Sequence, residues 1–209
     1  MTDASPGTPP LLEWGLAGAP LEGEDASGDL SVVVPFPDGA VVAVIDGLGH
    51  GFEAAAAARV AASAIEARAG DPLDDLVRHC HEEVRGTRGV VLSVAAFHAP
   101  SSSMAWLGVG NVAAVLLRAG RQNFDGRHVV QNRGGVVGYR LPSLAVSTLE
   151  VARGDLLVMA TDGIKAGFVD EIDREARDPD LLAAVLLAGY SRRTDDALVL
   201  VARYLGRAS

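Results

Sequence analysis

Apolar residues recur along this chain in two patterns, and these patterns predict its secondary structure. Short apolar runs bounded by glycine, proline or acidic residues indicate strands, whereas apolar residues spaced three or four apart indicate helices. The runs predict strands at residues 12–18, 30–35, 40–45, 90–97, 104–109, 112–118, 144–149, 155–161 and 197–205. The helical patterns cover residues 52–70, 72–85 and 179–188. Consecutive strands with short connections, and helices segregated from them, are typical of antiparallel sheets in the α+β class.

Two turns are predicted in some detail. The apolar runs at 30–35 and 40–45 flank the turn sequence FPDG, and if these four residues form the loop, paired positions sum to 75. Asp29 then lies directly opposite Asp46, an arrangement of like charges that destabilises a sheet unless a divalent cation binds the carboxylates. A second tight hairpin turn is expected at Gly110 and Asn111, because this dipeptide suits positive φ. The first hairpin predicts an acidic metal site.

Further carboxylates lie at the ends of other apolar strands. Asp162 follows the strand predicted at 155–161, and Asp195 and Asp196 precede the strand predicted at 197–205. Taken singly, Asp162 fits a common Asp-Gly turn, and the adjacent pair fits a solvated surface. If the two strands are antiparallel neighbours, however, the carboxylates of Asp162 and Asp195 lie at the same edge of a sheet. The combination favours one acidic site.

The loop DGLGHG at residues 46–51 joins a strand to a helix, as nucleotide-binding loops do. It lacks the third glycine of a dinucleotide fingerprint, because Phe52 occupies that position, and it lacks the Gly-Lys-Ser/Thr of a P-loop. Gly47 could instead offer a carbonyl oxygen to a cation. His50 could orient a water or a phosphate, although a solvated loop histidine is the simpler interpretation. The loop therefore favours a metal site over a nucleotide site.

Length and composition narrow the remaining possibilities. The 209 residues suffice for one domain, expected at residues 12–209 after a disordered lead at residues 1–11. A single cysteine, Cys80, excludes an internal disulfide and fits a reducing cytoplasm. No apolar run approaches the roughly 20 residues of a membrane span. The net charge of −9 argues against nucleic-acid binding. We therefore expect a cytoplasmic protein that binds neither membrane nor nucleic acid.

Five short motifs give the chain a family resemblance. They are GD at residues 28–29, DGLGHG at 46–51, GVGN at 108–111, TDG at 161–163 and TDDA at 194–197. In this order and rough spacing they resemble the bacterial metal-dependent serine/threonine phosphatases (the PPM family), in particular the SpoIIE-type branch and its short RsbX-like members. The resemblance covers about residues 12–205 and implies an αββα sandwich, two antiparallel sheets flanked by helices.

The resemblance also implies two divalent metal ions, manganese or magnesium, and their ligands. By analogy, Asp46 bridges both ions, and the Gly47 carbonyl completes one coordination shell. Asp162 and Asp195 hold the other ion, and Asp29 contacts the site directly or through water. The resemblance thus makes Asp46, Asp162 and Asp195 the expected catalytic residues.

The reaction implied by the resemblance is hydrolysis of phosphoserine or phosphothreonine by a water that the two metals activate. The substrates would be STAS-domain proteins of a stressosome or of a sigma-factor partner-switching pathway in stress-response signalling. Asp196 and His50 are expected to lie next to the metal ligands without binding the metals themselves. The basic residue that grips phosphate in eukaryotic relatives has no clear counterpart. The alternative is a non-catalytic pseudophosphatase that docks on STAS or switch-kinase partners, although all the expected ligands are present.

Overall fold

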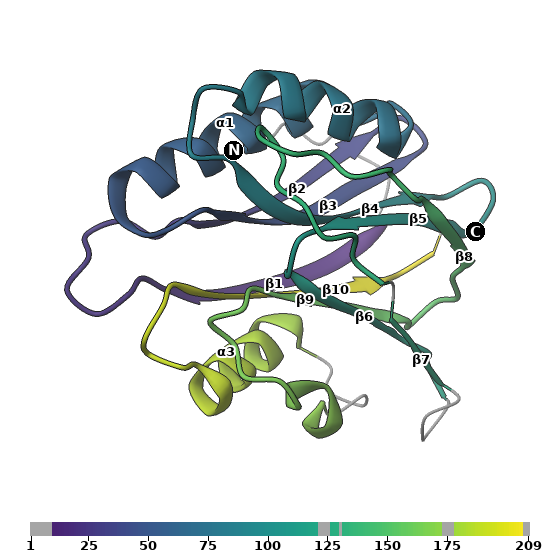
Figure 1. Cartoon of the computed structure of the whole chain (residues 1–209). Helices are drawn as coiled ribbons and strands as arrows, with labels where there is room; N and C mark the ends of the chain where they lie inside the picture. The colour runs from purple at the N-terminus through teal and green to yellow at the C-terminus, as the bar shows by residue number, and fades with distance from the viewer. Residues whose placement is uncertain (1–9, 121–125, 130, 173–177, 207–209) are drawn as a thin grey trace.

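The computed structural model describes residues 10–120, 126–129, 131–172 and 178–206 of the chain. Residues 1–9 of the expected lead at 1–11 lie outside the described residues. The described part forms two five-stranded antiparallel sheets with helices on their outer faces (Figure 1). This is the αββα sandwich, so the predicted α+β class is confirmed. No helix of the described part combines the length and the apolar character needed to cross a membrane.

One sheet has the strand order β2-β3-β4-β5-β8. Its strands are Asp29–Phe36 (β2), Gly39–Gly47 (β3), Val90–His98 (β4), Ser103–Val109 (β5) and Ser147–Glu150 (β8). Helices α1 (Gly51–Ala67) and α2 (Leu73–Val84) cover its outer face (Figure 1). The alanine-rich α1 packs closely on the sheet because its buried side is almost entirely alanine.

The other sheet has the order β1-β10-β9-β6-β7. Its strands are Leu12–Ala19 (β1), Ala113–Leu117 (β6), Arg127–His128 (β7), Leu156–Ala160 (β9) and Ala197–Tyr204 (β10). Helix α3 (Pro179–Tyr190) lies on its outer face, and a 3-10 turn spans Phe168–Glu171 (Figure 1). The Asp178 side chain begins α3 by accepting hydrogen bonds from the backbone N–H groups of Asp180 and Leu181.

The expected hairpin at Gly110 and Asn111 is wrong. β5 lies in one sheet and β6 in the other, where β6 pairs with β9 and β7, so the turn carries the chain across the sandwich. Gly110 does have a positive φ of 94°, as the turn chemistry predicts. Positive φ is a local property, and it does not determine whether the strands on either side pair with each other. The strand expected at 144–149 is also shorter and begins later, at Ser147.

Alternation along β3 divides the core into layers. Val41, Ala43 and Ile45 pack against the helices, whereas Val42 and Val44 pack between the two sheets. Fully burying one of these valine or isoleucine side chains contributes about 1.5–3 kcal/mol, and a slip of one residue would exchange the two faces. The same alternation directs the side chain that follows, at position 46, into the space between the sheets.

Candidate active site

Asp29 and Asp46 face each other across the β2–β3 hairpin. The whole register, from this pair to Phe36 opposite Gly39, keeps the predicted sum of 75 and is confirmed. The strands extend farther into the turn than expected, because Phe36 and Gly39 are themselves paired. The structure therefore brings two carboxylates together at the open end of the hairpin.

These two carboxylates are desolvated and lie among other negative charges. Burial, together with the smaller effect of the charges of Asp29, Asp162 and Asp195, raises the pKa of Asp46 to about 8. Burial also raises the pKa of Asp29 to about 7, although its hydrogen bond from Thr161 acts in the opposite direction. A bound divalent cation would reverse this effect, because it would be the largest charge in the site. The pair thus has the electrostatics of a cation site.

Thr161 connects Asp29 to the opposite sheet. Its Oγ1 donates a hydrogen bond to Asp29 Oδ2 at 2.7 Å and accepts one from the Leu198 backbone N–H at 2.9 Å. All three residues are buried. Asp29 begins β2 in one sheet, and Leu198 belongs to β10 in the other. Thr161 therefore fixes the separation of the two sheets at the site. Sequence reasoning included it only as a letter of the TDG motif.

Three predicted site residues, Asp46, Asp162 and Asp195, line one cavity of about 380 Å³. Asp162 follows β9 and Asp195 precedes β10, and these strands are antiparallel neighbours, as expected. The remaining lining residues are Leu21, Leu48, Gly49, His50, Val91, Asn111 and Thr194. Asn111 orients one of the acids, because its Nδ2 donates to Asp162 Oδ2 at 2.6 Å. Asn111 was not predicted as a site residue, although it ends the GVGN motif.

Asp29 lies deeper than these three acids and is nearly inaccessible to solvent. Among the residues that the structure describes, no three His, Cys, Asp or Glu side chains lie close enough together to hold one metal ion. The structure brings the predicted acids to one end of the sandwich, and their joint role as metal ligands stays a prediction.

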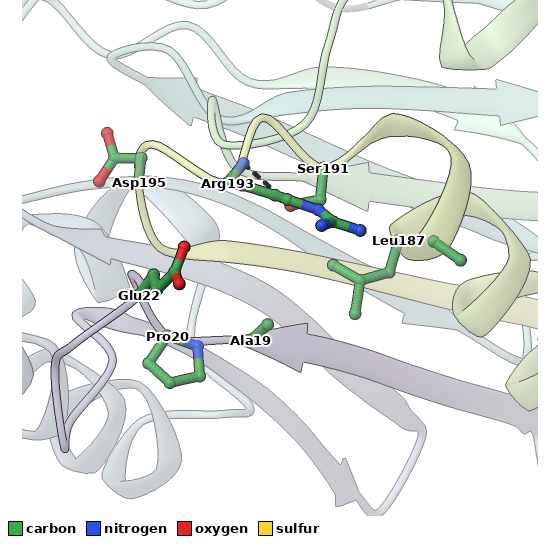
Figure 2. Close-up of a pocket in the computed structure, with 8 residues that line it drawn as sticks. Ala19, Pro20, Glu22, Leu187, Ser191, Arg193 and Asp195 are labelled. Carbon is green, nitrogen blue, oxygen red and sulfur yellow. Dashed lines mark hydrogen bonds between the residues drawn. The ribbon is translucent and has the colours of Figure 1, made fainter.

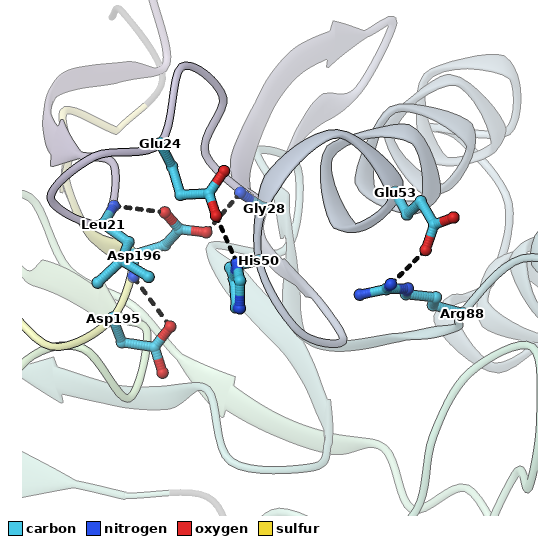
Figure 3. A network of polar contacts seen from close by, with 8 residues as sticks. All are labelled: Leu21, Glu24, Gly28, His50, Glu53, Arg88, Asp195 and Asp196. Atoms are coloured by element: carbon cyan, nitrogen blue, oxygen red, sulfur yellow. Dashed lines mark hydrogen bonds and ion pairs between the residues drawn. The ribbon is translucent and has the colours of Figure 1, made fainter.

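Asp196 holds the loop between β1 and β2. Its two carboxylate oxygens accept hydrogen bonds from the backbone N–H groups of Leu21, at 2.8 Å, and Gly28, at 2.7 Å (Figure 3). Asp196 is only 3% exposed, so both bonds are shielded from water. Gly28 directly precedes Asp29. The carboxylate of Asp196 thus positions a neighbouring acid, whereas its own N–H donates to Asp195 Oδ1 at 2.9 Å.

Gly47 and Gly163 are required by close packing. A Cβ on Gly47 would lie 2.2 Å from the carbonyl oxygen of Ala54 in α1, and one on Gly163 would lie 1.9 Å from the carbonyl oxygen of Asp196. The Gly47 N–H also donates to the Gly28 carbonyl at 3.1 Å, which joins the two acidic loops. Both Asp-Gly steps therefore let neighbouring backbone approach the acids closely.

His50 is oriented by an acid from the loop that precedes β2. Its Nδ1 lies 2.6 Å from Glu24 Oε1 (Figure 3). When Glu24 is ionised, Nδ1 carries the shared proton, and Nε2 is the ring nitrogen available to a ligand of the cavity. Outside the cavity, Arg88 and Glu53 form an exposed ion pair. Glu24 has no signal in the sequence, because it is one of several acids in a polar loop.

A basic segment lies beside the acids. Arg192 donates from its backbone N–H to the Gly163 carbonyl at 2.8 Å and from Nε to the Asp162 carbonyl at 2.9 Å. Arg193 follows it, two residues before Asp195. Sequence reasoning found no clear basic residue for the site. Arg192 is the basic residue that contacts the acidic segment, and the Arg-Arg pair directly before TDDA was its signal in the sequence.

Comparison with protein families gives one match that covers most of the chain. The family described as "Stage II sporulation protein E (SpoIIE)" matches residues 37–185. The chain belongs to the SpoIIE family. This membership confirms the resemblance to the RsbX- and SpoIIE-type branch of the PPM phosphatases.

Solved structures agree with the SpoIIE assignment. One was solved in work on the bacterial stressosome as "a modular system that has been adapted to control secondary messenger signaling". Its sequence is 31% identical to this chain, and the superposition has a TM-score of 0.83. The match covers 92% of this chain and 99% of that one. RsbX in complex with magnesium has 18% identity and a TM-score of 0.82, with coverages of 92% and 95%.

The PP2C phosphatase domain of SpoIIE from Bacillus subtilis has 20% identity and a TM-score of 0.75, with coverages of 95% and 64%. This likeness and that to RsbX establish the fold. Comparison with curated proteins gave no match.

Proposed function

We propose that this SpoIIE-family chain is a metal-dependent protein serine/threonine phosphatase. The observation that carries the proposal is that the buried Asp29 faces the half-buried Asp46 at the end of the sandwich where Asp162 and Asp195 line the same cavity as Asp46. A phosphate dianion is repelled by such a site unless cations are bound there. An acidic cavity in a phosphatase fold is therefore best understood as a cation-dependent phosphate site.

The residues present fit hard divalent cations. Carboxylate and backbone carbonyl oxygens are the ligands that magnesium and manganese prefer. The proposed ligands are Asp29, Asp46, Gly47 through its carbonyl, Asp162 and Asp195. The magnesium complex of RsbX supports magnesium or manganese in this chain too. Two such ions, when bound, supply a water of lowered pKa and neutralise charge on the phosphate.

The chain's own side chains would line the cavity and orient the groups inside it. Asp46, Asp162 and Asp195 are the proposed catalytic residues, since their carboxylates line the cavity that the phosphate would enter. Asn111 fixes the Asp162 carboxylate. His50, held by Glu24, would orient the water or the phosphate from the rim of the cavity. Nothing in this arrangement requires a phosphorylated protein intermediate.

The proposed substrates are phosphoserine and phosphothreonine on STAS-domain proteins of a stressosome or of sigma-factor partner switching. The 31% identical structure from work on the stressosome supports this class, as does the similarity to RsbX and SpoIIE. Cytoplasmic stress-response signalling would be the corresponding setting.

The test is phosphate release from a phosphorylated STAS domain, measured by mass. With manganese we expect turnover, and with chelator none. Asp46→Asn should lower turnover by orders of magnitude while the variant stays folded. Asp38→Asn, an exposed acid in the β2–β3 turn, is the matched control and should keep the parent rate. Hydrolysis by Asp46→Asn at the parent rate would contradict the assignment.

A pseudophosphatase is the second candidate, and one observation favours it: no three described acids or histidines already lie together as a metal site. A binding module of this kind would hold its STAS or switch-kinase partner without metal. Calorimetric titration with manganese, followed by partner binding in chelator, separates the two. Tight partner binding without any manganese binding would support the pseudophosphatase.

A further inference from the structure

A second cavity of about 250 Å³ lies beside the acidic one, between the end of β1, the C-terminal part of α3 and the loop that leads into β10 (Figure 2). We propose that this pocket is a recognition subsite for the polypeptide segment that flanks the phosphorylated residue of a protein substrate. This inference rests on the proposed phosphatase function and locates the surface by which the enzyme would recognise its substrate.

The position of the pocket supports this assignment. Asp195 lines both cavities, so a phosphorylated residue in the acidic cavity would place its neighbours in the chain at the second one. Because the two cavities share a lining residue, residues close in sequence to the phosphorylated one would reach the second cavity. Continuity through Asp195 points to an attached peptide segment rather than to a separate small molecule.

Arg193 supplies the charge that this segment would meet. Its side chain extends across the pocket toward Leu187, away from Asp195 (Figure 2). Throughout the described part of the chain, no carboxylate forms an ion pair with its guanidinium. The chain as a whole carries a net charge of −9, so such a cation stands out against an acidic background. An acidic residue of the substrate would therefore be attracted to the Arg193 side of the pocket.

The backbone of Arg193 is held in an unusual conformation. Its φ is 60°, in the left-handed region that residues other than glycine seldom occupy. Its N–H donates to Ser191 Oγ at 3.3 Å, which helps to fix the turn after α3. Such conformations persist where the surroundings determine them, and they are frequent at ligand sites. The turn thus directs the Arg193 side chain over the pocket.

The residues that line the pocket determine which other side chains of the substrate would fit it. Ala19, Pro20, Leu187 and Ala188 provide apolar surface, whereas Glu22 lies opposite Arg193 and leaves only the Arg193 side attractive to an anion. Burial of apolar surface supplies most of the affinity in such pockets, and a few polar groups fix orientation. The pocket therefore fits a segment with one apolar side chain next to the phosphoserine and a carboxylate beside it.

Two variants test the pocket in different ways. Arg193→Ala removes the charge, and Ala188→Trp fills the pocket from an exposed position on α3 without removing any group. Arg78→Ala, on the exposed side of α2, and Ala184→Trp, one turn earlier on α3, are matched controls outside the pocket. Each protein is assayed with manganese on two phosphoserine peptides and on p-nitrophenyl phosphate. One peptide carries Leu and Glu on both sides of the phosphoserine, and the other carries Ala and Gln.

We expect kcat/KM for the Leu/Glu peptide to fall about tenfold in each pocket variant, the change that a lost contact of 1.4 kcal/mol produces. The Ala/Gln peptide and p-nitrophenyl phosphate, which cannot fill the pocket, should change by less than about twofold. The controls should match the parent on all three substrates. An equal loss on every substrate, or parent values on the Leu/Glu peptide in both variants, overturns the subsite. If the parent itself hydrolyses none of them, the proposed phosphatase function fails, and the subsite with it.

Discussion

Thr161, which follows β9 in one sheet, donates a buried hydrogen bond to Asp29 of the other, with 2.7 Å between Oγ1 and Oδ2. The bond favours the ionised carboxylate and so lowers the pKa of Asp29, against the larger effect of burial. It also joins the sheets where the candidate metal ligands gather. One hydroxyl therefore contributes both to the stability of the sandwich and to the charge state of the site.

We expect Thr161→Val to destabilise the protein by about 1–3 kcal/mol, because the Asp29 carboxylate and the Leu198 N–H both lose a buried partner. The valine keeps the shape, so the loss reports the hydrogen bonds. Urea unfolding in the presence of chelator measures it. Thr148→Val on β8, where the side chain is exposed, should change stability by less than about 0.5 kcal/mol. Equal midpoints for the two variants would show that the link between the sheets contributes nothing.

Asp196→Asn should loosen the loop between β1 and β2. An amide has one oxygen, so it cannot accept from both the Leu21 and Gly28 N–H groups, and its own NH₂ would face one of them. We expect a loss of about 1–3 kcal/mol and faster hydrogen exchange at these two amides. Asp38→Asn, at an exposed turn position, serves as the control. Unchanged hydrogen exchange at both amides in Asp196→Asn would show that Asp196 does not hold this loop.

Gly47→Ala distinguishes two reasons for a glycine beside Asp46: the carbonyl that it could offer to a cation, and the close packing against α1. An alanine offers the same carbonyl, but its Cβ would lie 2.2 Å from the Ala54 carbonyl oxygen, so α1 or the loop must move. We expect a loss of about 1–3 kcal/mol, as for other overpacked sites, even in chelator. Gly134→Ala, where a Cβ meets nothing within 4 Å, should be neutral or slightly stabilising. Thermal unfolding of both variants checks this, and parent stability of Gly47→Ala in chelator would refute the packing argument.

The parts of the site that could be predicted from sequence are those that depend on local geometry. The register that places Asp29 opposite Asp46 follows from one short turn and period-two alternation. The contacts that complete the site join distant parts of the chain: Thr161 and Asp29 are 132 positions apart, and Asp196 and Gly28 are 168 apart. No local pattern encodes such partners.

The wrong hairpin at Gly110 has the same origin. Its positive φ was predictable, but β6 pairs with β9, which lies some forty residues farther along the chain, rather than with its neighbour β5. The side chain of Arg193 is a related case. The sequence shows two adjacent arginines, and only the turn after α3 decides that one lies near Asp162 and the other over a pocket.

The stability of the chelated protein should fall as pH rises through neutrality. The pKa values of Asp29 and Asp46 in the folded state, about 7 and about 8, lie above the ordinary value of 3.8. Between the unfolded and folded values the folded state binds more protons than the unfolded chain, so the free energy of unfolding decreases with increasing pH. We expect a loss of roughly 1–3 kcal/mol between pH 6 and pH 8. Urea unfolding at several pH values in chelator measures it.

Asp46→Asn provides the control for that slope and has an effect on stability opposite to its effect on turnover. With one ionisable group and one repulsion removed, the variant should lose part of the pH dependence and be more stable than the parent at pH 8 in chelator. Manganese should stabilise the parent more at pH 8 than at pH 6, because the cation binds the ionised carboxylates and competes with protons. It should stabilise Asp46→Asn far less. A parent protein whose stability in chelator rises from pH 6 to pH 8, with Asp46→Asn following the same curve, would show that these two carboxylates are not the desolvated pair that the fold indicates.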